Sequence, residues 1–218
     1  MPTPIGNLGD ISLRAIETLK TVDGILAEDT RKTGVLLKHH KINNKLYPYH
    51  QHNEHSRINA ITGRLIAGET LALVTDAGTP GISDPGFLLV RECIKKSIPV
   101  ESLPGAVAFI PALVNSGLPC DRFCFEGFLP HKKGRKKRID DLTQEKRTMI
   151  FYESPFRLPR MLKELSDILG AERQASVSRE ITKIYEETVR GNLEELLRHF
   201  QNRTVKGEIV VIVAGKED

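Results

Sequence analysis

The sequence predicts an α/β protein built from two domains. Short apolar runs, typical of buried strands, alternate along the chain with stretches whose apolar residues recur every three or four positions, typical of amphipathic helices. This alternation predicts strands joined by helices, and therefore a mostly parallel sheet in the N-terminal domain. The 218 residues suffice for two small domains, and the change of character at 117–121 predicts a boundary that gives domains 1–117 and 118–218.

The N-terminal half is organised around one apolar run, Leu71-Ala-Leu-Val74, which flanking breakers mark as a strand. Ser83-Asp84-Pro85 predicts the start of the helix that follows, with Asp84 as N-cap and Pro85 in the first position. In order, we expect a helix over 11–22, a strand over 24–27, a helix through 35–37, a strand over 45–49, a helix over 58–65, a strand over 71–74, a helix through 87–94, a strand over 98–103 and a helix over 106–114.

The C-terminal half alternates in the same way. Asn192 followed three residues later by Glu195 is a capping-box pattern, which predicts a helix start. In order, we expect a strand over 123–129, a helix over 136–144, a strand over 148–152, a helix that begins at 154–155 and ends at 170, strands over 175–179 and 184–189, a helix from 192 to 200 and a strand over 208–213.

The loop between the strand at 71–74 and the next helix is the best candidate for a ligand site. It holds Gly78, Pro80 and Gly81 and leads into a helix N-terminus, at the edge where open α/β sheets bind small molecules. The Lys-Ser/Thr ending of a nucleoside triphosphate-binding loop, the dinucleotide fingerprint and the hydrolase serine elbow are all missing from the sequence, which argues against those three activities.

Several strands are followed at once by clusters of polar residues. Each cluster alone has an ordinary structural explanation: Asp29 or Thr30 caps a helix, Glu153 and Arg157 pair at a spacing of four, and His50 faces water. Together they would line one edge of a parallel sheet, where α/β enzymes keep their chemistry. The clusters lie at 3–7, 28–31, 49–54, 76–84, 153–157 and 179–183.

Composition is that of a globular protein, with 28% charged and 39% hydrophobic residues. The net charge is only +4, but residues 131–138 hold six Lys and Arg and no acid. Such a run is usually a solvated face, and the concentration of charge here favours phosphate binding more than usual. Three cysteines are too few for a disulfide framework, and Cys120, Cys124 and His131 lack the further ligands of a metal site. No run reaches the roughly 18 apolar residues of a membrane span, and no leader is visible, so we expect a cytoplasmic protein without a metal.

The polar clusters also carry a resemblance to a known family. The string Asp-Ala-Gly-Thr-Pro-x-Ile-Ser-Asp-Pro-Gly over 76–86 is long and specific, and further matches cover nearly the whole chain. These matches lie at 3–8, 10–15, 28–31, 49–54, 75–86, 103–105, 125–130, 153–157, 179–183 and 206–208. The sequence resembles the tetrapyrrole methylase superfamily, and within it the branch that acts on ribosomal RNA.

The resemblance implies two α/β domains, the second with a mixed sheet, and S-adenosylmethionine bound in a cleft between them. It implies methyl transfer to the ribose 2′-OH of a cytidine in small-subunit (16S) ribosomal RNA, within the 30S subunit, by a homodimer. Ala106-Val107-Ala108 replaces the family's usual Pro-Ser/Cys-Ala, so only backbone contacts carry over there. The implied cofactor residues are Pro4, Asp76, Gly78, Thr79, Pro80, Ser83, Gly105, Val107, Ala108 and Tyr152.

A ribose hydroxyl is a weak nucleophile, so a positioned base is expected to take its proton. The candidates are Glu28, Asp29, His50, Glu180 and Lys183, with Glu28 and Lys183 favoured; a lysine serves only if its pKa is lowered. Arginine forks match phosphate, and the basic run would hold the RNA backbone without reading bases. The implied RNA ligands are Asn7, Arg31, Lys132, Lys133, Arg135, Lys136, Lys137, Arg138, Arg157 and Arg179.

Two alternatives remain open from the sequence. One is a methylase that uses S-adenosylmethionine on a tetrapyrrole or another small molecule. The other is an RNA-binding protein without catalysis, since the family's first strand usually precedes Thr3 and only Met1 and Pro2 stand before it here. The chain also stops at Asp218, where family members often continue, so a C-terminal extension is expected to be absent.

Overall fold

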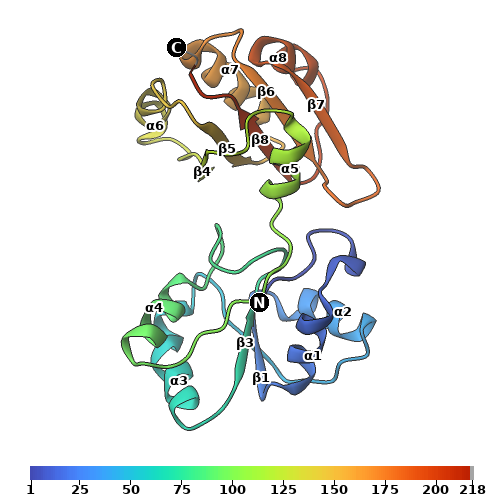
Figure 1. Ribbon diagram of the computed structural model, residues 1–218, viewed down its shortest axis with the longest axis vertical. Helices are drawn as coiled ribbons and strands as arrows, with labels where there is room; N and C mark the ends of the chain where they lie inside the picture. Colours follow the sequence, from blue (N-terminus) through green and yellow to red (C-terminus); the bar gives the residue numbers. More distant parts are fainter. Residues whose placement is uncertain (217–218) are drawn as a thin grey trace. The chain divides into compact units, whose positions relative to one another are not determined.

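The computed structural model describes residues 1–216, and they form two compact units that divide between Val107 and Ala108 (Figure 1). The predicted class, two α/β units with a parallel first sheet and a mixed second sheet, is confirmed. The division lies before the stretch at 117–121 where we expected it. The reason is α5 (Phe109–Ser116), which packs against β6, β7 and β8 of the second unit. No helix among residues 1–216 is long and apolar enough to cross a membrane.

The first unit is a three-stranded parallel sheet with helices on both faces. Its strands run in the order β2-β1-β3, with Ile25 paired with Leu46 on one side and with Ala72 on the other. Figure 1 shows α1 and α2 on one side of β1 and β3, and α3 and α4 on the other. The elements are η1 (Leu8–Asp10), α1 (Leu13–Thr21), β1 (Gly24–Ala27), α2 (Thr30–His39), β2 (Leu46–Pro48), α3 (Glu54–Ile66), β3 (Leu71–Val74) and α4 (Phe87–Lys95).

Alternation along β1 explains the two helical layers. Ile25 and Ala27 belong to a core cluster with Leu19 of α1 and Leu37 of α2, whereas Leu26 belongs to another cluster that reaches α3 and α4. Successive side chains of a strand point to opposite faces, so a strand covered on both faces must be apolar throughout. All residues of β1 are buried, as this geometry requires.

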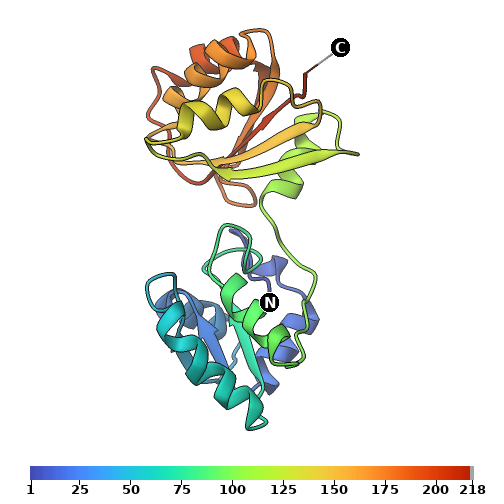
Figure 2. The same cartoon turned by 90° about the vertical axis from the view of Figure 1, so that its left-hand side faces the viewer.

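The second unit is a mixed sheet of five strands in the order β4-β5-β8-β6-β7. β4 and β5 are parallel, while β8 runs antiparallel to both β5 and β6. One face is covered by α6, α7 and α8, and α5 lies on the opposite face (Figure 2). The elements are β4 (Phe123–Phe128), α6 (Arg135–Asp141), β5 (Thr148–Glu153), α7 (Leu158–Leu169), β6 (Gln174–Arg179), β7 (Glu187–Asn192), α8 (Leu193–Phe200) and β8 (Ile209–Val213).

Several predicted elements differ from the structure, and three of them are informative. The strand expected over 98–103 is wrong, because Pro99 has no N–H to give a ladder and Val100 is 47% exposed. Asp84 does not cap α4; Gly86 does, at a φ of 138°. A Cβ at Gly86 would lie 3.0 Å from Leu73, so the chain needs glycine for this turn and the helix starts later than predicted. The strand expected from 184 begins only at Glu187.

The capping box of α8 is confirmed. The Glu195 N–H donates to the Asn192 side chain at 2.8 Å, and the Asn192 N–H donates to the Glu195 carboxylate at 2.9 Å. We expect Asn192→Ala to lower the free energy of unfolding by about 1 kcal/mol, because the Glu195 N–H loses its side-chain acceptor. Urea unfolding followed by circular dichroism measures this. Asn202→Ala, at an exposed position after α8, is the control and should leave the midpoint unchanged; equal midpoints for both variants would contradict the expectation.

Candidate functional site

The carboxyl ends of β1, β2 and β3 meet at one edge of the first sheet. Because all three strands are parallel, the residues that follow them lie side by side. Glu28 and Asp29 follow β1, His50 follows β2 by one residue, and Asp76 follows β3 by one residue. The sequence placed these polar clusters at a common edge, and the hydrogen bonds below connect the loops after β1 and β3.

Asp76 joins the loop after β3 to the loop after β1. Its carboxylate accepts the Asp29 N–H at 3.1 Å and the Lys32 ammonium at 2.6 Å. Its own N–H donates to the Glu28 carboxylate at 3.2 Å. The carboxylate of Asp76 is 27% exposed, so part of its surface stays open to a ligand. The sequence reasoning missed Lys32, although it lies one helical turn after Asp29 and so shares its face of α2.

The glycine loop is closed by two backbone hydrogen bonds between Thr3 and Gly78. The Thr3 N–H donates to the Gly78 carbonyl at 2.9 Å, and the Gly78 N–H donates back at 3.0 Å. Gly78 has a φ of +84°, which a side chain would strain. The Thr79 hydroxyl donates to the Ala106 carbonyl at 3.0 Å, so the segment before the domain boundary lies on this loop.

A close approach of backbone explains Gly105. A Cβ there would lie 2.6 Å from Cβ of Pro2, so the N-terminal segment packs where a side chain would stand. Pro4 is buried next to it, and Val107 and Ala108 are half-buried. Gly105 is therefore required because the Pro2 ring packs directly against its backbone.

Two predicted residues lie in exposed turns. Ser83 has a φ of +63° and an exposed side chain. Asn7 is exposed and caps η1, where its side chain accepts the Gly9 N–H at 3.0 Å. A non-glycine residue at positive φ costs of order 1 kcal/mol or more, and such strain concentrates at ligand loops.

Asp29 is a poor candidate for a general base. Arg31 binds its carboxylate through two hydrogen bonds, Nε to Oδ1 at 3.0 Å and Nη2 to Oδ2 at 2.6 Å. The Arg31 guanidinium, followed by the Arg31 backbone N–H, holds the pKa of this carboxyl well below its usual range. A carboxylate held so firmly in its charged form has little tendency to take a proton.

His50 retains an unused ring nitrogen. Its Nε2 lies 3.2 Å from the Asn53 amide nitrogen, which donates to it in the tautomer that carries the proton on Nδ1. Nδ1 is buried and has no hydrogen-bond partner within residues 1–216. Buried polar atoms normally find partners, so a free imidazole nitrogen beside the Glu28 edge is a position for a bound polar group.

The second unit has a similar edge at the carboxyl ends of β4, β5 and β6. There the Lys183 ammonium donates to Glu180 at 2.8 Å and to Glu208 at 3.0 Å. Burial alone would lower the pKa of Lys183, but the hydrogen bonds to these two carboxylates outweigh it and raise the pKa above its ordinary value. The Lys183 hydrogen bond also lowers the pKa of Glu180. A lysine can act as a base only if its pKa is lowered, and the pKa of Lys183 is raised instead. Lys183 therefore stays a cation at neutral pH.

The loop after β6 is strained. Glu180 and Thr182 have φ values of 51° and 66°, and a β-branched residue in this region is an outlier. The Glu180 N–H donates to the Glu208 carbonyl at 3.0 Å, and the Glu180 side chain fills the space where a Cβ of Gly207 would stand. Glycine at 207 is what allows this packing.

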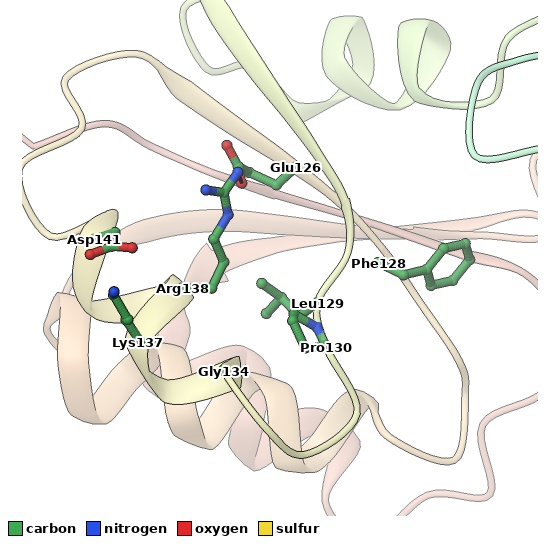
Figure 3. A pocket seen from close by; sticks show the side chains of 8 residues that line it. All are labelled: Glu126, Phe128, Leu129, Pro130, Gly134, Lys137, Arg138 and Asp141. Carbon is green, nitrogen blue, oxygen red and sulfur yellow. Dashed lines mark ion pairs between the residues drawn. The ribbon is translucent and has the colours of Figure 1, made fainter. Parts of the chain in front are cut away.

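The basic run after β4 divides into exposed and buried cations. Lys132, Lys133, Lys136 and Lys137 are exposed on the loop and on α6. Arg138 reaches the Glu126 carboxylate at 2.6 Å, as Figure 3 shows, in the wall of a cavity of about 340 Å³. Exposed lysines at this density remain suited to a polyanion.

Arg135 differs from the RNA contact we expected. It is 3% exposed, and its guanidinium donates to Glu164 at 2.5 Å, to Glu153 at 3.3 Å and to the Pro130 carbonyl at 3.3 Å. The Glu153 side chain has no exposed surface. Arg135 therefore neutralises a buried carboxylate, and its donors are not available to phosphate.

The other predicted residues of this edge are also paired. Arg157 binds Glu153 at 2.7 Å and Arg179 binds Glu187 at 2.6 Å, so both retain only part of their donor capacity. Tyr152 packs in an aromatic group with Phe125 and Phe128, with ring centroids 5.1 Å and 5.6 Å away. No group of three His, Cys, Asp or Glu side chains among residues 1–216 is arranged to hold a metal ion.

A family model described as tetrapyrrole (corrin/porphyrin) methylases matches residues 2–197. The chain belongs to the tetrapyrrole methylase family. Its relatives in this family include three proteins named ribosomal RNA small subunit methyltransferase I, which confirms the branch that the sequence motifs indicated. That of Synechocystis sp. is 51% identical over 98% of this chain and 77% of its own length. The relative from Escherichia coli O157:H7 is 49% identical over 99% of this chain and 76% of its own length. The relative from Thermotoga maritima is 45% identical over 99% of this chain and 96% of its own length.

Solved structures of tetrapyrrole methylases share the fold. The methyltransferase CobJ superposes with a TM-score of 0.71 at 18% identity, over 96% of this chain and 90% of its own. A uroporphyrin-III C-methyl transferase from Thermus thermophilus, complexed with S-adenyl homocysteine, gives a TM-score of 0.64 at 17% identity. The match covers 95% of this chain and 92% of that one. At such identities the similarity indicates a shared fold and does not indicate a shared substrate.

Proposed function

We propose that the protein is a methyltransferase that uses S-adenosylmethionine to methylate the ribose 2′-OH of a cytidine in small-subunit (16S) ribosomal RNA. The observation that carries the proposal is the near-full-length identity, 45–51%, to relatives named ribosomal RNA small subunit methyltransferase I. The ribose and the cytidine follow from the resemblance of the motifs to that branch. The tetrapyrrole alternative draws only on structures at 16–20% identity, which support a common fold.

The edge of the first sheet fits the methyl donor. The carboxylates of Glu28 and Asp76 accept backbone N–H groups here. Carboxylates also accept hydroxyl and amino groups, and their charge favours a cationic sulfur. Gly78 adds a backbone surface without a side chain, which allows a ligand to come close.

When bound, S-adenosylmethionine supplies a methyl group on a positively charged sulfur. This methyl group would pass to the ribose oxygen, the bonding electron pair would stay on the sulfur, and a base of the chain would take up the hydroxyl proton. The chain's contribution is to align the hydroxyl, which is worth about 7–11 kcal/mol in favourable cases, and to receive this proton. Glu28 is the better candidate, since Asp29 and Glu180 are held as carboxylates by cations and the unprotonated Nε2 of His50 already accepts the Asn53 amide.

The RNA backbone is proposed to lie on the exposed cations of both units. Arg31, whose side chain is 89% exposed, flanks the carboxylate edge of the first unit. The lysines of the basic run supply the second unit, and Arg135 is left out because it is buried. Such contacts position the strand and make its affinity depend on salt.

A homodimer in the cytoplasm completes the proposal. The apolar side chains of Phe87, Val90 and Ile94 on α4 are 62%, 37% and 66% exposed, which supports association with a second copy. Light scattering of the purified protein should give twice the mass of the chain. A monomer at micromolar concentration would contradict the dimer.

One assay tests the activity. The protein is incubated with methyl-labelled S-adenosylmethionine and 30S subunits from a strain that lacks the modification, and the label is mapped. We expect label on the ribose of a cytidine. Label on a base would overturn the assignment of the 2′ oxygen. The absence of transfer, under conditions where a full-length relative transfers, would contradict the proposed function, and failure to bind the cofactor in calorimetry would leave only the non-catalytic alternative.

A further inference from the structure

A second cavity, of about 680 Å³, opens beside the strained loop after β6. Its volume is in the range of small-molecule sites and is ample for one nucleotide. It is walled by the ends of β6 and β7, by the C-terminus of α8 and by the loop that leads into β8. The cavity belongs wholly to the second unit, and neither the methyl-donor edge nor the basic run contributes to it.

One wall of this cavity is an aromatic side chain in water. Tyr185 is 72% exposed and its neighbour Ile184 is 94% exposed. Phe200 and Val205 also line the cavity. An exposed aromatic ring beside cationic side chains is the kind of surface on which proteins stack unpaired bases.

The charges around the cavity leave a cationic excess at one end. Glu187 is matched by Arg179 at 2.6 Å, and Glu180 by Lys183 at 2.8 Å. Arg203 is 3.7 Å from Glu187, a loose pair. Lys206 is exposed and forms no hydrogen bond or ion pair with the rest of residues 1–216. Arg203 and Lys206 are thus the lining cations least neutralised by carboxylates, and such cations favour a phosphate diester.

The position of the cavity's loop is fixed rather than adaptable. Glu180 and Thr182 adopt left-handed backbone conformations, and the Thr182 N–H donates to the Glu186 carboxylate at 2.7 Å. Each such conformation costs roughly 1–3 kcal/mol and persists only where surrounding contacts hold it. This strained loop leads directly to Ile184 and Tyr185, which are presented to solvent.

We propose that this cavity binds one unpaired nucleotide of the substrate RNA, with its base stacked on Tyr185 and its phosphate between Arg203 and Lys206. The inference rests on the proposed function, because it assigns a subsite to the same RNA substrate. The bound nucleotide would anchor the RNA strand on the second unit.

The test compares Tyr185→Ala with Tyr185→Phe and with Phe156→Ala. Phe156 is a matched control, since it is 93% exposed on the loop after β5 but does not line the cavity. We expect Tyr185→Ala to raise the KM for 30S subunits about tenfold, or about 1.4 kcal/mol, with kcat and the calorimetric Kd for S-adenosylmethionine unchanged. Tyr185→Phe should keep the wild-type KM because the stacking face remains. Equal losses for Tyr185→Ala and Phe156→Ala would overturn the assignment to this cavity.

Salt dependence supplies an independent readout for the phosphate. Lys206→Ala should reduce the slope of log Kd for RNA against log salt by about 0.7, the value for one single-strand phosphate, whereas Lys163→Ala on α7 should leave it unchanged. Unchanged slopes for both variants would overturn the phosphate contact. A wild-type protein that binds no RNA would overturn the proposed function and this inference together. A wild type that methylates RNA while Tyr185→Ala binds RNA equally well would overturn this inference alone.

Discussion

Asp76→Asn should weaken binding of S-adenosylmethionine by about 10- to 100-fold while leaving the protein folded. A hydrogen bond to a charged group contributes about 1.5–3 kcal/mol, and each 1.4 kcal/mol is a factor of ten. The substitution keeps the shape of the side chain, but it removes the carboxylate that the proposal assigns to the donor's hydroxyl and amino groups. Calorimetry with S-adenosylmethionine measures the Kd, and labelled transfer to 30S subunits measures kcat/KM.

The fold should tolerate this change because the Asp76 interactions are few and partly exposed. Its ion pair with Lys32 joins side chains that are 27% and 64% exposed, and such pairs contribute about 0–1 kcal/mol. In the variant, the amide oxygen of the new side chain can still accept the hydrogen bond from the Asp29 N–H. Thermal unfolding followed by circular dichroism should therefore shift little.

Two controls separate a ligand contact from an indirect effect. Lys32→Met removes the ion pair and keeps the carboxylate, so it should bind the cofactor at least as well as the wild type. Asp121→Asn removes an exposed carboxylate far along the chain and should have no effect. If Lys32→Met lost as much affinity as Asp76→Asn, the carboxylate would act by holding Lys32, and the assignment of Asp76 as a direct ligand would fail.

The convergence of the strand ends could be predicted from sequence because it needs only strand type and direction. Apolar runs at 24–27 and 71–74 coincide with β1 and β3, and parallel pairing brings the residues after them together. The contact between Asp76 and the Asp29 N–H then follows from a register that pairs Ala27 with Val74. Local sequence patterns were sufficient here, because parallel strands place all their carboxyl ends at the same edge of the sheet.

Short local motifs, such as a helix-start dipeptide, predicted the structure less reliably than the periodic spacing of apolar residues. Asp84-Pro85 has the composition of a helix start, yet the chain needs two more residues and a φ of 138° at Gly86 to approach Leu73. The stretch over 98–103 pairs with no strand of the described residues, 1–216. Both outcomes depend on tertiary packing, which overrides local preference and which residue type alone does not encode.

The role of each cation depends on whether its side chain is buried, and the charge of a basic run does not indicate this. Arg135 stands among lysines, and its charge suggested phosphate binding. A second pattern in the same stretch predicts the opposite: Arg135, Ile139 and Leu142 are spaced by four and three, and all three are buried. This is the spacing of the inward face of a helix, so position 135 belongs to the core side of α6. Helical phase, rather than charge density, was the informative pattern.

Arg135→Ala should therefore destabilise the second unit, by about 3 kcal/mol, without removing an RNA contact. Removing one partner of a buried ion pair costs about 3–5 kcal/mol, because the remaining charge stays buried. We expect the lower end, since Arg157 still binds Glu153 at 2.7 Å and Arg160 still binds Glu164 at 2.9 Å. Urea unfolding followed by circular dichroism gives the change in the free energy of unfolding.

The adjacent Lys136→Ala is a matched control, because it removes the same charge from an exposed position of the same helix. It should leave stability within about 0.5 kcal/mol of the wild type and weaken RNA binding slightly, with a shallower dependence on salt. Arg135→Ala, measured where it remains folded, should keep the wild-type salt dependence. The opposite pattern, a stable Arg135→Ala protein with a reduced salt slope, would mean that the guanidinium leaves Glu153 to bind phosphate. Two neighbouring cations in one basic run are thus expected to have separable roles: Arg135 neutralises the buried Glu153 beneath α6, and Lys136 is proposed to contact the RNA.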